Sequence, residues 1–198
     1  MANLDTPFGF KPVKHLNGSP WNGQANVYYI PSTDNTAVFK GDAVKSAGSA
    51  DATGKYPTVA QATAGAAVRG VVIGFGDNPY VMIQADTPLR AYRPAATAMY
   101  CLVVDDPQVI FEVQEDSDAN SITAAMVGLS TNFVVGSGST ATGKSAMELD
   151  SSDTGTDTSG NCRILRLVNR DDNELGDYAK WEILFGEHEL GLTISTDV

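Results

Sequence analysis

The chain has 198 residues, with 13 Lys and Arg against 24 Asp and Glu, which gives a formal net charge of -11 at pH 7. A surface of that sign repels phosphate backbones, and the basic residues are scattered singly, so we expect no nucleic-acid partner. Hydrophobic residues make up 42% of the chain, enough for a packed core, whereas no apolar run approaches the ~20 residues that cross a bilayer. The length and composition therefore predict one domain, or at most two small ones, with no membrane partner.

The first 25 residues differ from the rest in composition, being close to neutral and rich in proline, glycine and aromatic residues. Prolines at that density disfavour helices and inner strands, yet aromatic side chains have large apolar areas to bury. We therefore predict an extended N-terminal arm over residues 1–25, followed by a single β-rich domain over residues 26–198. The candidate partner-binding residues of the arm are Pro7, Phe8, Phe10, Pro12 and Trp21. The sequence leaves open whether the arm packs on its own domain or on a neighbouring subunit.

Strand signals follow the arm at short, regular spacing. Internal glycines in the segment 67–75 indicate a kink or bulge. Turn signals such as Asn78-Pro79 and Asp106-Pro107 separate the later segments. This pattern predicts an all-β protein, either a β-barrel or a β-sandwich. The predicted strands are 26–30, 37–39, 42–45, 67–75, 80–84, 99–104, 109–114, 133–135, 162–168, 180–185 and 190–194.

The remaining segments predict little regular structure. Residues 121–127 alone have helical composition, with Gly128 placed to end a helix, so we expect at most one short helix. Residues 46–55 are predicted to form a hairpin loop. Residues 136–161 form a long loop rich in Gly, Ser, Thr and Asp, with one strand-like piece at 146–149. Loops of that length usually carry function or mobility.

The two cysteines, Cys101 and Cys162, are far apart and outside any Cys-x-x-Cys spacing. They predict free thiols in a protein made in a reducing cytoplasm. No signal-peptide pattern opens the sequence.

Residues 138–145, Gly-Ser-Thr-Ala-Thr-Gly-Lys-Ser, fit the pattern of a phosphate-binding loop and follow an apolar strand. In such a loop the backbone N–H groups would hold phosphates, Lys144 would contact the outer phosphates and Ser145 would bind magnesium. A phosphate loop must open a helix, however, and residues 146–149 run directly into a polar stretch from Asp150. We therefore expect no nucleotide cofactor.

Two acidic stretches are candidates for a cation. Residues 116–120, Asp-x-Asp-x-Asn, begin like an EF-hand loop, but Ser121 replaces the required glycine and Val127 replaces the bidentate glutamate. A mobile loop carrying Asp150, Asp153 and Asp157 is a second candidate, against the simpler interpretation that these acids are solvated. We predict no metal site.

Catalytic patterns are weak. The two histidines are His15 and His188, and neither accompanies a Gly-x-Ser-x-Gly elbow or zinc-ligand spacing. A carboxylate pair for glycoside hydrolysis depends on separation in space, which the sequence does not give. The prediction is a protein that is not an enzyme, with no catalytic or cofactor-binding residues.

Three stretches together carry a resemblance to a known family. They are Met1-Ala-Asn-Leu-Asp-Thr-Pro-Phe-Gly-Phe-Lys-Pro-Val13, Ala37-Val-Phe-Lys-Gly-Asp-Ala-Val44 and Val104-Asp-Asp-Pro-Gln-Val-Ile-Phe-Glu-Val-Gln114. The sequence resembles the small virion structural proteins of tailed bacteriophages, of the capsid cement or decoration type, over residues 1 to about 115. The chain is longer than the better-known trimeric decoration proteins.

The resemblance implies a β-rich virion protein, assembled in the host cytoplasm, that binds the capsid exterior and cross-links neighbouring capsomers. Its partners would be the major capsid protein and copies of itself in a homo-oligomer. Two alternatives stay open: a tail-associated or receptor-binding β-module that uses the loop at 136–161, and a hydrolase. Copy number in the virion separates the capsid protein from the tail-associated module, because only the former would be present in hundreds of copies. A cleft with perturbed carboxylates would favour the hydrolase.

Overall fold

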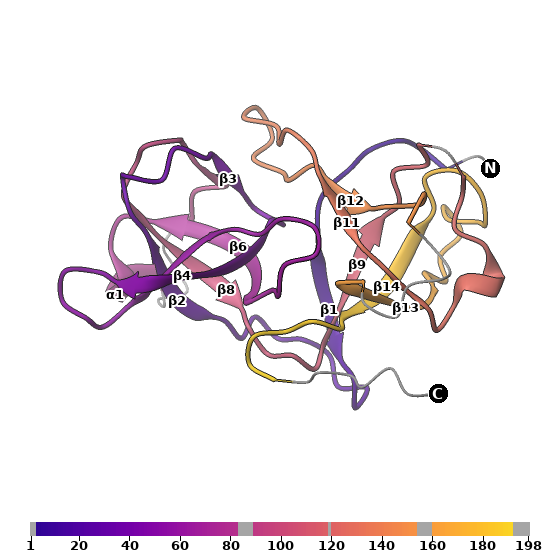
Figure 1. Ribbon diagram of the computed structural model, residues 1–198, viewed down its shortest axis with the longest axis horizontal. Helices are drawn as coiled ribbons and strands as arrows, with labels where there is room; N and C mark the ends of the chain where they lie inside the picture. Colours follow the sequence, from indigo (N-terminus) through magenta and orange to yellow (C-terminus); the bar gives the residue numbers. More distant parts are fainter. Residues whose placement is uncertain (1–2, 83–88, 119, 154–159, 192–198) are drawn as a thin grey trace.

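The computed structural model describes residues 3–82, 89–118, 120–153 and 160–191. The chain is nearly all β, with 41% strand and 4% helix, and contains a closed five-stranded barrel, so the predicted fold class is confirmed. Figure 1 shows the barrel strands towards one end of the long axis and an open sheet towards the other.

The barrel consists of β2 (Asn26–Ile30), β5 (Pro57–Gln61), β4 (Ala43–Ala50), β6 (Gly70–Gly76) and β8 (Met99–Val104), in that spatial order. The register of β6 against β8 shifts between Val72 and Gly74, which is the bulge that the internal glycines predicted. Inward-pointing side chains fill the barrel because alternate strand residues face the same side. This core comprises Tyr28, Ile30, Val38, Val44, Val59, Val72, Phe75, Met99, Cys101 and Val103.

A short pair of strands, β3 (Val38–Phe39) and β7 (Tyr92–Arg93), lies beside the barrel, with the rings of Phe39 and Tyr92 stacked at 5.4 Å. The Arg93 side chain is completely buried. Its guanidinium donates hydrogen bonds to the carbonyl oxygens of four residues in two loops, at 2.6–2.9 Å: Pro31, Asp34, Thr36 and Thr97. One buried cation therefore fixes both loops to the barrel.

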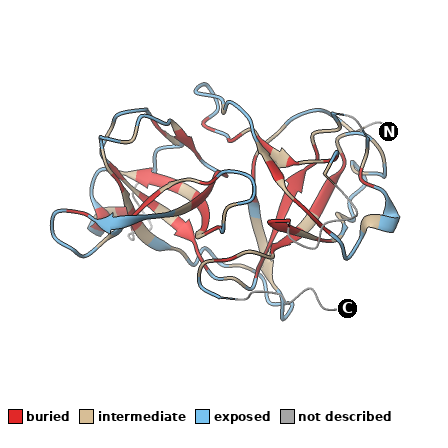
Figure 2. Cartoon of the chain, viewed as in Figure 1, coloured by how far each residue is buried: buried red, intermediate tan, exposed pale blue. Residues whose placement is uncertain are grey.

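The open sheet has the order β1 (Lys11–His15), β9 (Val109–Gln114), β14 (Lys180–Phe185), β13 (Cys162–Leu167) and β10 (Ser130–Thr131), and its neighbouring strands are antiparallel. A hairpin of β11 (Phe133–Val135) and β12 (Met147–Leu149) contributes to the core on one face of this sheet. That core includes Phe10, Phe111, Val113, Phe133, Met147, Leu149, Ile164, Trp181, Ile183 and Phe185. Figure 2 shows the buried strands in both regions.

The barrel and the sheet are joined by shared packing. Ala43, Val71 and Val104 are cross-strand neighbours on three barrel strands, and all three belong to the core of the open sheet. Their side chains face away from the barrel interior, because their sequence neighbours Val44, Val72 and Val103 fill it. The barrel wall therefore forms one side of the second core.

Four sequence-based element predictions were wrong in whole or in part. Residues 46–50 continue β4 rather than forming a loop; they are exposed small residues, so the apolar alternation that marks a strand is missing. Residues 80–82 of the strand predicted at 80–84 lie instead in helix α1 (Pro79–Met82), and residues 83–84 are outside the described residues. The Asn78 side chain accepts a hydrogen bond from the Tyr80 N–H at 3.0 Å, and proline suits the first helical position.

The predicted helix at 121–127 is reduced to one 3-10 turn, η1 (Ala124–Met126). Ile122 is 1% exposed and its N–H donates to Glu115 Oε2 at 2.8 Å, so the segment before the turn is held against the core. Of the strand predicted at 190–194, Leu190 lies in a turn and residues 192–194 are outside the described residues.

Candidate functional site

Phe10 of the predicted arm lies in the core of its own chain. It is 2% exposed, and its ring centroid is 4.9 Å from that of Phe185 and 5.7 Å from that of Phe133. Its N–H donates to the Gly41 carbonyl at 2.9 Å. In this conformation a partner could not reach Phe10. Of the two possibilities that the sequence left open, Phe10 therefore packs on its own chain rather than on a neighbouring subunit.

Gly9 shows how closely the arm approaches the body. It has a φ of +73°, and a Cβ built there would lie 2.5 Å from the Gly41 carbonyl oxygen and 2.5 Å from Ser145 Cβ. Both the backbone conformation and the lack of space require glycine. Residues 9–10 are therefore fixed against the body of the protein.

The other arm candidates are half-buried rather than free. Pro12 lies in β1 opposite Phe111 of β9, and proline is tolerated there because β1 is an edge strand. Trp21 packs against the core of the open sheet, and its Nε1–H donates to the Gln24 carbonyl at 3.1 Å. Pro7 and Phe8 are of intermediate exposure.

The free edge of β1 is partly occupied by the chain itself. The Trp21 N–H donates to the Val13 carbonyl at 3.3 Å, and the His15 N–H donates to the Ser19 carbonyl at 2.8 Å. Residues 11–15 of the predicted arm are thus a strand of the open sheet, paired with β9. The most exposed apolar side chains near the N-terminus are Leu4 and Leu16, which the sequence analysis did not select.

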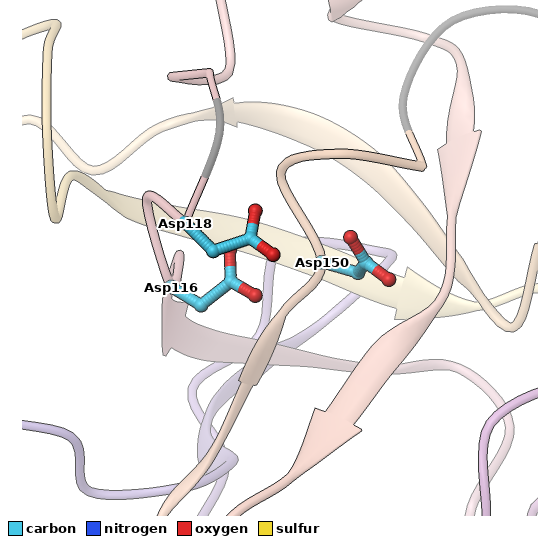
Figure 3. Close-up of side chains that lie close together, drawn as sticks. All are labelled: Asp116, Asp118 and Asp150. Atoms are coloured by element: carbon cyan, nitrogen blue, oxygen red, sulfur yellow. The ribbon is translucent and has the colours of Figure 1, made fainter.

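Three carboxylates from the two acidic stretches come together. Figure 3 shows Asp116 and Asp118 on the segment after β9, beside Asp150 at the end of β12. One oxygen from each lies within 4.8 Å of the others. Backbone pairing brings the two segments together. Glu115 forms an isolated β-bridge with Leu149, and the Asp116 N–H donates to the Leu149 carbonyl at 3.0 Å.

The chemistry of this acidic cluster (Asp116, Asp118 and Asp150) suits a hard cation, because calcium and magnesium prefer oxygen ligands. One of the carboxylate oxygens is already engaged within the protein: the hydroxyl and the N–H of Ser151 both donate to Asp116 Oδ1, at 2.7 and 3.0 Å. Of the other predicted loop acids, Asp153 accepts a hydrogen bond from the Asn132 side chain, and Asp157 lies outside the described residues.

Two glutamates with a buried carboxylate oxygen, Glu115 and Glu148, lie close to this cluster in the sequence, and the sequence analysis missed both. The Oε1 atoms of both are buried and have no hydrogen-bond partner within the described part of the chain. Burial is the main cause that raises the pKa of each carboxyl to about 7, although Glu115 Oε2 accepts hydrogen bonds from Ile122 and Trp181. A glutamate directly after a fully buried strand was the available signal for Glu115.

The phosphate-loop motif forms a closed turn of its own. The Ser139 N–H donates to the Lys144 carbonyl at 2.9 Å, and the Gly143 N–H donates to the Ser139 carbonyl at 2.7 Å. A phosphate would have to compete with these bonds, and no helix follows the turn in the described part of this loop. The turn lines a shallow cavity of about 330 Å³ together with Arg90 and Tyr92.

The nucleophile and base candidates also have structural surroundings. His15 Nδ1 is 3.2 Å from Asp106 Oδ2, whereas His188 Nδ1 accepts the Leu190 N–H and burial lowers its pKa. Cys101 and Cys162 are free and completely buried, and burial raises the pKa of both thiols. Thiols in that state are poor nucleophiles.

The chain matches no protein-family model, no curated protein and no solved structure. Among the described residues, no helix combines the length and the apolar character needed to span a membrane.

Proposed function

We propose that this protein is a non-enzymatic structural component of a tailed-phage virion, which binds the outside of the capsid and stabilises the shell by linking neighbouring capsomers. One observation supports the proposal most: the three stretches that carry the resemblance meet in space. Lys11 and Pro12 of the first stretch pair with Glu112 and Phe111 of the third. Phe10 of the first donates its N–H to Gly41 of the second.

The second and third stretches lie on either side of strand β6. Ala43 pairs with Val71, which pairs with Val104 at the start of the third stretch. The resemblance therefore corresponds to one contiguous framework at the junction of the barrel and the open sheet.

The proposed mechanism is attachment at many equivalent sites. Each contact can be weak, since repetition over a symmetric shell and linkage between copies multiply the total attachment. The acidic body would face solvent and keep particles apart by charge repulsion. Because Phe10 is internal and the β1 edge is partly occupied, the contact would come from the exposed surface rather than from an arm that adds a strand.

Co-sedimentation tests the proposal. The purified chain is mixed with empty shells assembled from the major capsid protein of the phage that encodes it. We expect saturable binding in a fixed ratio to the shell subunits, and a higher melting temperature for decorated shells. A chain that stays in the supernatant at all concentrations would contradict the proposal.

The exposed residues 139–142, beside Arg90 and Tyr92, favour a second candidate, a tail-associated β-module that contacts a host surface. That function requires few copies per particle and binding to cells or glycans. Saturable glycan binding that is lost when residues 139–143 are replaced by a Gly-Ser linker would favour it over the shell function.

A further inference from the structure

The outer face of the open sheet gathers basic residues that the sequence scatters. Glu112 of β9 and Glu182 of β14 are directly opposite each other in the register, and both point away from the core. Two like charges directly opposite each other on adjacent strands repel, so the pair needs cations nearby. Four basic side chains surround them: Lys11, Lys14, Arg166 and Arg170.

Each carboxylate oxygen has its own cation. Glu112 Oε1 is 2.9 Å from Arg170 and Oε2 is 3.8 Å from Lys11. Glu182 Oε1 is 2.8 Å from Lys14 and Oε2 is 2.6 Å from Arg166. Four positive charges therefore surround two negative ones, with Asp172 adding one further carboxylate against Arg170.

The two glutamates are largely covered, so the charges of this face that reach the surface are the four cations and the Asp172 carboxylate, whose side chain is 61% exposed. The side chains of Glu112 and Glu182 are 5% and 14% exposed, whereas those of Lys11 and Arg166 are 60% and 59% exposed. The cations also keep unused capacity, because lysine has three N–H donors and arginine has five. Arg166 donates from Nε to Glu182 Oε2, and among the described residues its two outer nitrogens are available for a second carboxylate.

We infer that this basic face (Lys11, Lys14, Arg166 and Arg170) is a docking surface for a carboxylate-rich surface of a different protein. The inference deepens the proposed function and rests on it for the partner, which would be the shell protein. Charge complementarity favours this occupant, because carboxylates would pair with the exposed cations of the basic face. A nucleic acid fits less well, because a chain of net charge -11 repels a continuous polyanion more strongly than a local group of carboxylates.

The test variant is Lys11→Gln/Arg166→Gln. It removes the two most exposed cations but leaves Arg170 with Glu112 and Lys14 with Glu182, so neither buried carboxylate loses all its partners. The control is Lys40→Gln/Lys55→Gln, which makes the same change of charge at two exposed lysines elsewhere. Far-ultraviolet circular dichroism verifies that both variants fold.

The probe is a fluorescein-labelled oligoglutamate peptide, measured by anisotropy at low ionic strength. We expect the wild type and the control to bind equally, and the test variant to bind at least about fivefold more weakly. No saturable binding by the wild type, or equal loss in both variants, would overturn the inference. Tighter binding of oligothymidylate than of oligoglutamate would overturn it in favour of a nucleic acid.

The same variants in the shell co-sedimentation assay separate the two proposals. Wild-type binding that the test variant loses and the control keeps supports both. Wild-type binding that the test variant retains overturns the basic face and leaves the shell function standing. Salt-sensitive self-association of the wild type that the test variant abolishes would place a second copy on this face and overturn the assignment to a different protein.

Discussion

The Phe10 ring is buried between the rings of Phe133 and Phe185. An aromatic side chain among prolines and glycines predicts a ring that must be buried, and the ring is buried. The sequence does not show what covers it, because Phe133 and Phe185 are more than 120 positions away along the chain. Glu115 is the converse case, since its position directly after a buried strand was a signal of burial, but a charged residue is ordinarily expected at the surface.

Substituting Phe10→Ala should lower the free energy of unfolding by about 3–5 kcal/mol, because it leaves a cavity between two other rings. Urea unfolding measures this. The control Leu4→Ala removes an apolar side chain that is 74% exposed, and it should change stability by less than about 0.5 kcal/mol. Equal, small effects of the two substitutions would mean that the N-terminal segment does not pack on its own chain.

Glu115 should make the protein less stable as the pH rises. Its folded pKa of about 7 is above the ordinary value of 4.5, so between these values the folded state keeps a proton that the unfolded state loses. Stability is therefore greatest below about pH 4.5 for this group and falls as the pH approaches and passes 7. Glu115→Gln removes the effect, so the variant should gain up to about 3 kcal/mol over the wild type between pH 4.5 and pH 8. A difference in urea unfolding that stays constant with pH would refute the assignment.

At the scale of elements, the apolar strands were predicted most accurately. The predicted bounds 26–30, 99–104, 109–114 and 180–185 coincide with β2, β8, β9 and β14, because each is an uninterrupted β-rich segment with a core-facing side. Strands stabilised mainly by their partners were missed, including β1, β5 and β7. For these the deciding information lies in the pairing strand and not in the segment itself.

Arg93 provides a test of how β7 holds the adjacent loops. Arg93→Met leaves four carbonyl oxygens without their donor, so we expect the free energy of unfolding to fall by at least about 3 kcal/mol. Thermal and urea unfolding measure the loss. Arg90→Met is the control, because Arg90 is 58% exposed and pairs with exposed Asp77, where about 1 kcal/mol or less is expected. A loss at position 93 no greater than that at position 90 would contradict the role assigned to Arg93.

At the scale of the whole molecule, the arrangement follows from long-range pairing. The sequence gives an all-β chain of the right class, yet it does not reveal that a barrel wall and an open sheet share one core. The same pairing brings Asp116, Asp118 and Asp150 together and collects four basic side chains on one sheet face. The sequence placed the three aspartates in two separate stretches without showing that these stretches meet, and the four basic residues come from two segments more than 150 residues apart.

The central claim is that this chain covers the outside of a capsid, and its copy number in purified virions tests that claim most directly. Quantitative mass spectrometry against the major capsid protein gives the ratio. The account predicts a fixed, simple ratio to the capsid subunits, with loss of the chain on protease treatment of intact particles. A handful of copies per particle, or complete absence from purified virions, would contradict it.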